Sequence, residues 1–264
     1  MPWIKDFPLS RLLVNPHYSY LRYGIGVEQA GYTPNDLGSE SFLQTDHPFA
    51  ATLMLKNFLI ATDTVHRQRF ATTLSLGIIG PDALADKIQD AVHTFIHDVV
   101  PGGWKYQVQN DIIANYQVDY QKQLLSLNNI LLLDAEGTAR AGTLNDKAGA
   151  GIDLVAGIFQ SPFGNDVADP CLHFYLYDNP EVDVIGYDAT LQGGLFDHSS
   201  AYTIPAADIS RVTFTNRVGA IMSYKHIRLE YDECTLTKQF TTGPCHLWGT
   251  ISLGILLNNR KQAD

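Results

Sequence analysis

The sequence predicts an all-β fold of long antiparallel strands with a single long helix. Three observations lead to this prediction. Apolar and polar residues alternate along most of the chain, which places successive side chains on opposite faces of a strand. Turn-forming clusters of Gly, Pro, Asn and Asp separate the alternating stretches. Only residues 82–99 carry apolar residues at the three- and four-residue steps of a helix.

Length and composition restrict the class of protein. The 264 residues contain no linker, low-complexity run or repeat, so we expect one domain over residues 1–264. The net charge of −10 and the lack of a Lys/Arg cluster argue against nucleic-acid binding. Cys171, Cys234 and Cys245 form neither a metal-binding spacing nor a disulfide framework, so we expect free thiols. No apolar run approaches the length of a membrane helix, about 20 residues, and no signal peptide follows Met1.

The strands follow an irregular lead-in over residues 1–17, and a polar tail over 258–264 ends the chain. We expect about ten strands of roughly 10–14 residues, longer than the usual strand of about 5–6 residues. They cover residues 18–31, 49–60, 69–78, 112–121, 129–142, 148–159, 185–195, 211–224, 227–232 and 247–257. Turns are expected at 62–64 and 145–146. Irregular structure is expected over 160–183, where prolines interrupt the pattern, although residues 173–177 could be extended.

The helix lies between the third and fourth strands. Pro81 suits its first turn, because the missing N–H needs no partner there, and the segment 101–103 (Pro-Gly-Gly) ends it. One face carries an apolar stripe made of Leu84, Ile88, Val92, Phe95 and Val99. Another edge carries Gln89, His93 and His97 at four-residue steps. A lone helix with histidines in a β-rich protein indicates a functional site.

The strand period leaves two architectures open. In a soluble β-sandwich the apolar faces meet in a core. In an outer-membrane barrel the apolar faces meet lipid and the polar faces line the interior. Long strands, tyrosines near strand ends and short turns alternating with longer loops favour the barrel. The polar rows Asn115–Gln117–Asp119 and Arg228–Glu230–Asp232 are then expected to form a hydrogen-bonded interior.

Several segments carry a resemblance to a known family. Around the helix these are LGIIGP (76–81), QDAVH (89–93) and the residues Gly103, Trp104, Gln107, Asn110 and Asp111. GYTPND (31–36) and DHPFA (46–50) are similar to a YTP segment and a D-R-P-[YF]-A segment in the same order, and YDATLQGGLF (187–196) is compatible with the C-terminal half. Together, over about residues 20–257, they resemble the outer-membrane lipid A 3'-O-deacylase family.

The resemblance implies a twelve-stranded barrel in the bacterial outer membrane, with about ten strands in this chain and the helix in an extracellular loop. It implies a carboxylic ester hydrolase that removes an acyl chain of lipid A, so lipid A or lipopolysaccharide is the expected partner, and we expect a monomer. The motif places the general base at His93, with Gln89 and Asp46 as further site residues. A neutral imidazole can take a proton from water near pH 7, and the family's calcium ion (Ca2+) supplies positive charge for the oxyanion.

The sequence also departs from the family pattern. The family's Asn-Asp pair and TD..YTNG segment, which bring calcium ligands, have no counterpart here. We therefore expect two strands, the signal peptide and the calcium ligands to be missing from this sequence, and activity to be impaired or incomplete. His47 stands where the family often has arginine, and the polar tail is unusual for a barrel.

Each site residue has an alternative interpretation. His93 could make a structural hydrogen bond at the rim, Gln89 could belong to a polar helix edge, and Asp46 could cap a loop. Trp104 is interpreted as a packing or interfacial residue. His93 and His97 lack the Glu of an HExxH motif and a third ligand, so no zinc site is expected. A non-catalytic outer-membrane barrel and a soluble β-rich ligand-binding protein are the alternative functions.

Overall fold

Within the part of the chain that the structure describes, ten antiparallel strands form one continuous sheet whose order follows the chain from β1 to β10. The computed structural model describes residues 18, 20–34, 46–97, 101–128, 130–164 and 171–255. The strands are β1 (Tyr20–Tyr32), β2 (Ala50–Asp63), β3 (Gln68–Ile79), β4 (Asp111–Leu127), β5 (Leu131–Gly142), β6 (Asn145–Ile158), β7 (Leu172–Asp188), β8 (Val212–Tyr224), β9 (Ile227–Leu236) and β10 (His246–Ile255). The helices are η3 (Pro81–Ala83), α1 (Ala85–Ile96), η4 (Trp104–Tyr106) and α2 (Ala189–Gln192).

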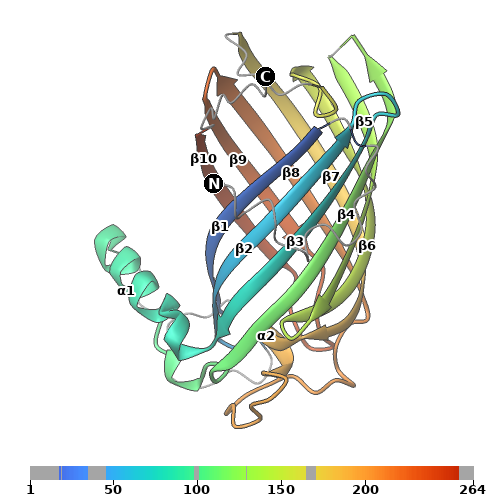
Figure 1. Ribbon diagram of the computed structural model, residues 1–264. Helices are drawn as coiled ribbons and strands as arrows, with labels where there is room; N and C mark the ends of the chain where they lie inside the picture. Colours follow the sequence, from blue (N-terminus) through green and yellow to red (C-terminus); the bar gives the residue numbers. More distant parts are fainter. Residues whose placement is uncertain are drawn as a thin grey trace.

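The sheet curls into an incomplete barrel, with α1 outside the curl (Figure 1). This arrangement confirms the predicted barrel wall, and the single continuous sheet replaces the two packed sheets of a sandwich. None of the helices within the described ranges is long and apolar enough to cross a membrane. We call the end of the barrel that carries α1 and α2 the helical end, and the opposite end, with the β2–β3 and β8–β9 turns, the turn end.

In the described part of the chain β1 and β10 are the edge strands, and each pairs with one neighbour. The two edges approach each other at the helical end. His246, the first residue of β10, lies edge-on to His47 with ring centroids 6.0 Å apart. The His47 ring in turn stacks on Tyr32, the last residue of β1, at 5.7 Å.

The bounds of the strand predicted over 185–195 are wrong, because β7 starts at Leu172, includes the extended segment considered at 173–177 and ends at Asp188. It passes through Pro180, where the β6–β7 pairing is interrupted between Glu181 and Asp178. The donor that proline lacks therefore falls at a gap in the ladder. Asp188 ends the strand, since its side chain accepts a hydrogen bond from the Thr190 backbone N–H (2.9 Å) at the start of α2.

The helix and two turns also differ from prediction in their limits. The predicted helix over 82–99 divides into η3 and α1, because Leu84 between them is left-handed (φ 60°). Residues 98–100 of that prediction, like the lead-in and the tail, lie outside the described residues. The turn expected at 145–146 lies earlier, so that β6 already starts at Asn145.

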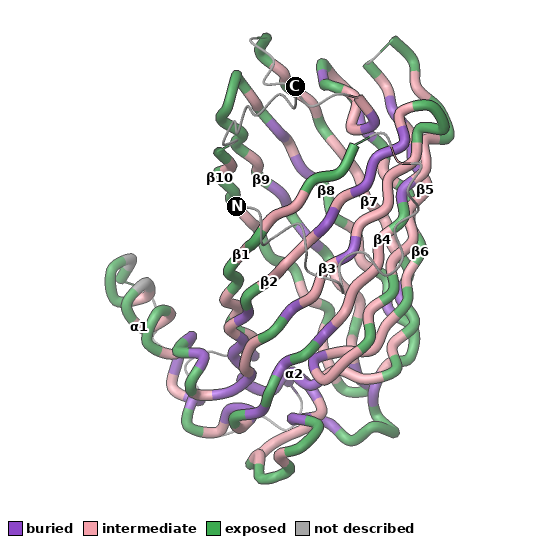
Figure 2. The backbone as a smooth tube through the Cα atoms, viewed as in Figure 1, coloured by how far each residue is buried: buried purple, intermediate pink, exposed green. Residues whose placement is uncertain are grey.

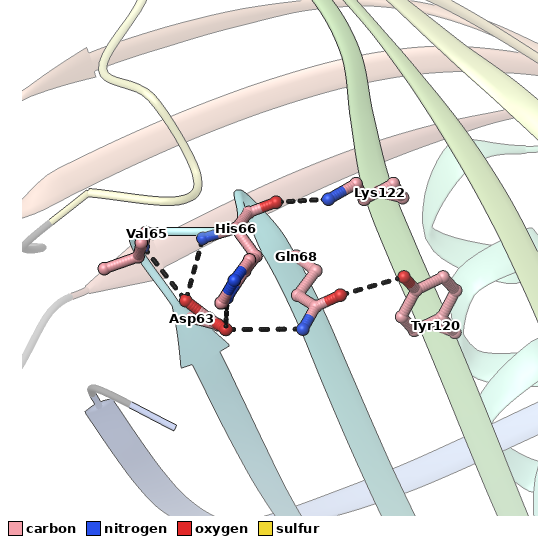
Figure 3. Close-up of polar contacts among 6 residues, drawn as sticks. All are labelled: Asp63, Val65, His66, Gln68, Tyr120 and Lys122. Carbon is pink, nitrogen blue, oxygen red and sulfur yellow. Dashed lines mark hydrogen bonds and ion pairs between the residues drawn. The ribbon is translucent and has the colours of Figure 1, made fainter. Parts of the chain in front are cut away.

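The β2–β3 turn lies after Asp63 rather than around it (Figure 3). Asp63 Oδ1 accepts hydrogen bonds from the backbone N–H groups of Val65 and His66, both at 2.9 Å. Its Oδ2 lies 2.7 Å from His66 Nδ1 and accepts from Gln68 Nε2 at 3.3 Å. Tyr120 of β4 donates to Gln68 Oε1 at 3.0 Å. One carboxylate thus organises the turn and ties it to the next strand.

Exposed and more buried residues alternate along the strands (Figure 2), and the exposed rows are apolar whereas the buried rows of the inner face include charged residues. Residues of the outer rows include Ile25, Val27, Leu55, Leu76, Ile112, Leu154, Leu176, Val218, Leu229, Ile251 and Leu253. Buried charged residues on the inner face include Asp134, Asp183 and Asp232. This distribution is the reverse of a water-soluble protein and is the one expected when lipid surrounds the sheet.

The inner rows form the predicted hydrogen-bonded interior. Gln117 Nε2 donates to Asp119 Oδ1 at 2.7 Å, and Thr138 donates to the same oxygen at 3.0 Å. Across the barrel wall, Glu230 accepts from the Tyr177 hydroxyl at 2.7 Å and from Arg228 at 3.0 Å. A cavity of about 650 Å³ remains inside, with polar groups such as Arg69, Glu136 and Asp153 along its wall.

A charge on the outer face should destabilise the folded protein in a bilayer. Leu55 lies near the middle of β2 and is exposed on the outer face. We expect Leu55→Arg to lower the free energy of unfolding by about 2–4 kcal/mol, because the charge enters hydrocarbon. Urea titration of protein refolded into lipid vesicles measures the change. Val65→Arg, in the exposed β2–β3 turn, is the matched control and should cost much less; equal costs would contradict a lipid-facing outer row.

Candidate active site at the helical end

The segment that carries α1 leaves the sheet at Gly80. Gly80 has φ 114°, a conformation that favours glycine, and a Cβ there would lie 2.6 Å from the backbone nitrogen of Asn110. Its own N–H donates to the carbonyl of Ala51 at 2.8 Å. Asn110 accepts a hydrogen bond from the backbone N–H of Asp82 at 3.0 Å. The two ends of the helix-bearing segment are therefore held together at the rim.

The base of α1 packs against the outer side of the sheet. Phe49, Ala51, Ala83, Ala85 and Trp104 form a buried apolar cluster with Leu53 and Ile78 packed against it. Gly31 makes room for it, since a Cβ at this position would lie 3.4 Å from Ala85 and 3.5 Å from Trp104. Gln29 Nε2 also donates to the carbonyl of Ala83 at 2.5 Å. These contacts fix where the helix starts.

The structure places Gln89 and His93 together on one face of α1, as their spacing predicts. Gln89 Oε1 accepts a hydrogen bond from Trp104 Nε1 at 3.1 Å. The Trp104 ring packs on Phe49 with centroids 5.0 Å apart, so it is a buried packing residue. Nδ1 of His93 is shielded from solvent. Gln89 is therefore tied to the sheet, and His93 lies one helical turn further along the same face.

Asp46 lies on the segment that leads into β2 and has a different environment. Its Oδ1 accepts from the backbone N–H of His47 at 2.7 Å, and its carbonyl accepts from the Tyr202 hydroxyl at 3.1 Å. Asp46 thus acts as a loop cap. A catalytic role for Asp46 stays a prediction. Asp46 is connected to the helix only indirectly. Phe49, three residues later in the chain, packs on Trp104, which in turn contacts Gln89 of α1.

His47 is buried, and its neighbours come from distant parts of the chain. Its Nδ1 lies 2.6 Å from the carbonyl of Pro48, its ring stacks on Tyr32, and His246 lies edge-on. Burial lowers the pKa of His47 to about 4, the Pro48 carbonyl opposes this shift, and His246 adds to it. Sequence reasoning missed Tyr32, Tyr202 and His246 as neighbours, because nothing local links residues that only the closing sheet brings together.

Asp111 anchors a second loop at this rim. Its Oδ2 accepts from the backbone N–H groups of Phe196 at 2.7 Å and Asp197 at 3.0 Å, while Oδ1 accepts from Ile112 at 2.6 Å. A Cβ at Gly194 would meet the same carboxylate at 2.2 Å, so glycine is required for this close approach. Asp111 and Gly194 belong to segments that carry the family resemblance, and the structure shows that they contact each other.

Calcium binding requires a cluster of oxygen donors. Among the described residues no group of three or more His, Cys, Asp or Glu residues could hold a metal ion. Calcium prefers six to eight oxygen ligands, some of them carboxylates, and the described ranges hold no cluster of carboxylates for it.

Comparisons with known proteins point to one family. A family model described as outer membrane protein LpxR matches residues 2–257. The solved structure of LpxR from Salmonella typhimurium is similar in fold, with a TM-score of 0.77 and 19% sequence identity over 90% of this chain and 84% of that one. No curated protein sequence matches significantly.

Stability should depend on the pH through His47. The pKa of His47 is about 4 when folded and 6.5 for an ordinary histidine, so the unfolded chain binds a proton that the folded protein does not. As the pH falls from 6.5 to 4, the free energy of unfolding is expected to decrease by up to about 3 kcal/mol. His47→Gln should remove most of this loss, measured by urea unfolding at both pH values. His226→Gln, in the exposed β8–β9 turn, should retain it; an identical pH dependence in His47→Gln would refute the assignment.

Trp104 and Gln89 should be energetically coupled, because one hydrogen bond joins their side chains. Trp104→Phe keeps the packing on Phe49 but removes the donor, and Gln89→Ala removes the acceptor. Each variant is expected to lose about 1 kcal/mol of unfolding free energy. The double variant should lose less than the sum, because the two changes remove one bond. Additive losses in such a cycle would show that this bond does not hold the helix.

Proposed function

Because the chain belongs to the LpxR family of outer-membrane proteins, we propose that it is an outer-membrane esterase that hydrolyses an acyl ester of lipid A. The observation that carries this proposal is the face of α1 with Gln89 and His93, held at the rim by Trp104. The fold agrees with this location, because its apolar outer rows suit a lipid environment. The ester bonds of an outer-leaflet lipid lie near the rim of such a barrel.

We assign His93 as the general base. Its Nδ1 is shielded from solvent, so we assign proton transfer to Nε2. In the proposed reaction Nε2 takes a proton from water as the water oxygen attacks the ester carbonyl carbon. The tetrahedral intermediate then collapses and breaks the bond to the sugar oxygen. The proton passes from His93 to that oxygen, which leaves a sugar hydroxyl and a free fatty acid.

We assign Gln89 a positioning role. Its side-chain oxygen is occupied by Trp104, so it connects the helix face to the packed cluster behind it. This connection limits the movement of His93, one turn away on the same helix. Small displacements of a catalytic group lower rates strongly, which is why a residue outside the reaction can matter.

Calcium is treated separately, because the described residues contain no ligand cluster for it. No step of the proposed reaction passes through a metal ion. A second candidate function is a non-catalytic barrel that retains the family fold. The two candidates differ in whether His93 is needed for ester cleavage.

His93→Asn should reduce lipid A hydrolysis by at least about 100-fold, the smallest usual contribution of a general base. Mass spectrometry of lipid A in reconstituted vesicles detects the released acyl chain. His97→Asn is the matched control, because His97 caps the same helix and is exposed; it should retain activity. If wild type and His93→Asn give the same product level, including none, the non-catalytic barrel is the better assignment.

A further inference from the structure

The exposed side of α1 is apolar. Leu84, just before the helix, is 42% exposed, Ile88 is 52% exposed and Phe95 is 83% exposed. Successive residues of a helix turn by about 100°, so Ile88 and Phe95 fall within one narrow sector, and Leu84 adjoins the start of the helix. Lys87 and Thr94 lie at one margin of this sector and are also exposed. We call Leu84, Ile88 and Phe95 the outer sector.

The opposite side of α1 is polar and more buried. It carries Asp86, Gln89, Asp90 and His93, none of which is in the exposed class. Oδ1 of Asp86 and Oδ1 of Asp90 are shielded from solvent, and so is Nδ1 of His93. A surface helix in water has the reverse arrangement, with its apolar face against the protein. The helix and the sheet therefore both expose apolar side chains and turn polar side chains toward the protein.

The outer sector continues the apolar outer face of the barrel. The base of α1 packs on Gly31 of β1, and Ile25 and Val27 of the same strand are exposed on the same face, at alternate positions. Figure 1 shows α1 standing outside the curl of the sheet beside β1, pointing from the helical end back toward the turn end. The helix therefore occupies the space that surrounds the barrel wall.

We propose that α1 is embedded in the outer leaflet of the membrane, with its outer sector in contact with lipid acyl chains and its polar side turned to the protein. The location follows from continuity with the lipid-facing rows of the barrel. Lys87 at the margin can extend its charged end to the headgroups while its stem stays in lipid. The helix then acts as a membrane-inserted arm of the barrel.

This placement also gives a reason for the position of His93, a consequence that rests on the proposed function. A base on the protein-facing side of an embedded helix lies at the depth of the lipid's ester bonds rather than in bulk water. A substrate would reach it by lateral movement within the leaflet. The embedding itself does not depend on this consequence.

The embedding can be measured with spin labels, without any activity. Cys171→Ser and Cys245→Ser remove the two exposed thiols, and Cys234 is buried. Phe95→Cys and Ile88→Cys are then labelled in the full chain, reconstituted in phospholipid vesicles. Labels in hydrocarbon collide with oxygen far more than with a water-soluble nickel chelate. We expect both sites to resemble a label at Leu253→Cys on the outer row of β10.

Val65→Cys in the β2–β3 turn is the aqueous control, since Val65 is exposed to a similar extent, 79%, outside the strands. Nickel access at Phe95 equal to that at Val65 would overturn the proposal. So would low access to both reagents, because it would mean that protein covers the outer sector.

A second variant links the arm to activity. Phe95→Asp should lower hydrolysis of lipid A in vesicles by at least about tenfold. The free energy of transferring a Phe side chain from lipid to water is at least as large as the free energy that corresponds to this factor. Hydrolysis of lipid A dispersed in detergent should change little. An equal loss in both media would contradict a membrane role for Phe95. Absence of wild-type activity would count against the proposed function alone, because the spin-label result stands by itself.

Discussion

Backbone hydrogen bonding in lipid is the constraint on which the structure depends. Hydrocarbon offers no partner for N–H and C=O groups, so the chain must satisfy them itself. From β2 to β9, each strand does so by pairing with both of its neighbours in sequence, whereas β1 and β10 pair on one side within the described residues. Even Pro180 obeys this constraint, because the donor it lacks falls at a gap in the ladder. Apolar side chains can then face outward to the lipid, and polar side chains can face the barrel interior.

The same sorting extends to the helical end. There α1 turns its polar side to the protein and its apolar side outward, although it is not part of the ladder. Its own backbone hydrogen bonds are internal, which is the other way a chain can lie in lipid. Barrel and helix therefore follow one physical rule, and the candidate base lies where the polar side of the helix meets the protein.

The rim that carries the site is held by contacts between distant segments. Gly80 and Asn110 close the helix-bearing segment, Trp104 links it to Phe49, and Asp111 holds the loop after α2. The buried ring of His47 joins the first and last strands. These contacts keep the site in place while the barrel wall below it supplies rigidity.

The sequence by itself determined the number of strands among the described residues, the inward polar rows and the face shared by Gln89 and His93, because each follows from a period of two or 3.6 residues. Period could not predict β7, since Pro180 looks like a strand breaker until its partner strand is known. The helical period did predict the apolar stripe of α1, but it could not predict whether the stripe faces the protein or its surroundings. Only the tertiary structure decided that Leu84, Ile88 and Phe95 of this stripe face outward and that Tyr202 and His246 meet the DHPFA segment. A local pattern records which residues share a face, whereas the packing of distant segments decides what that face meets.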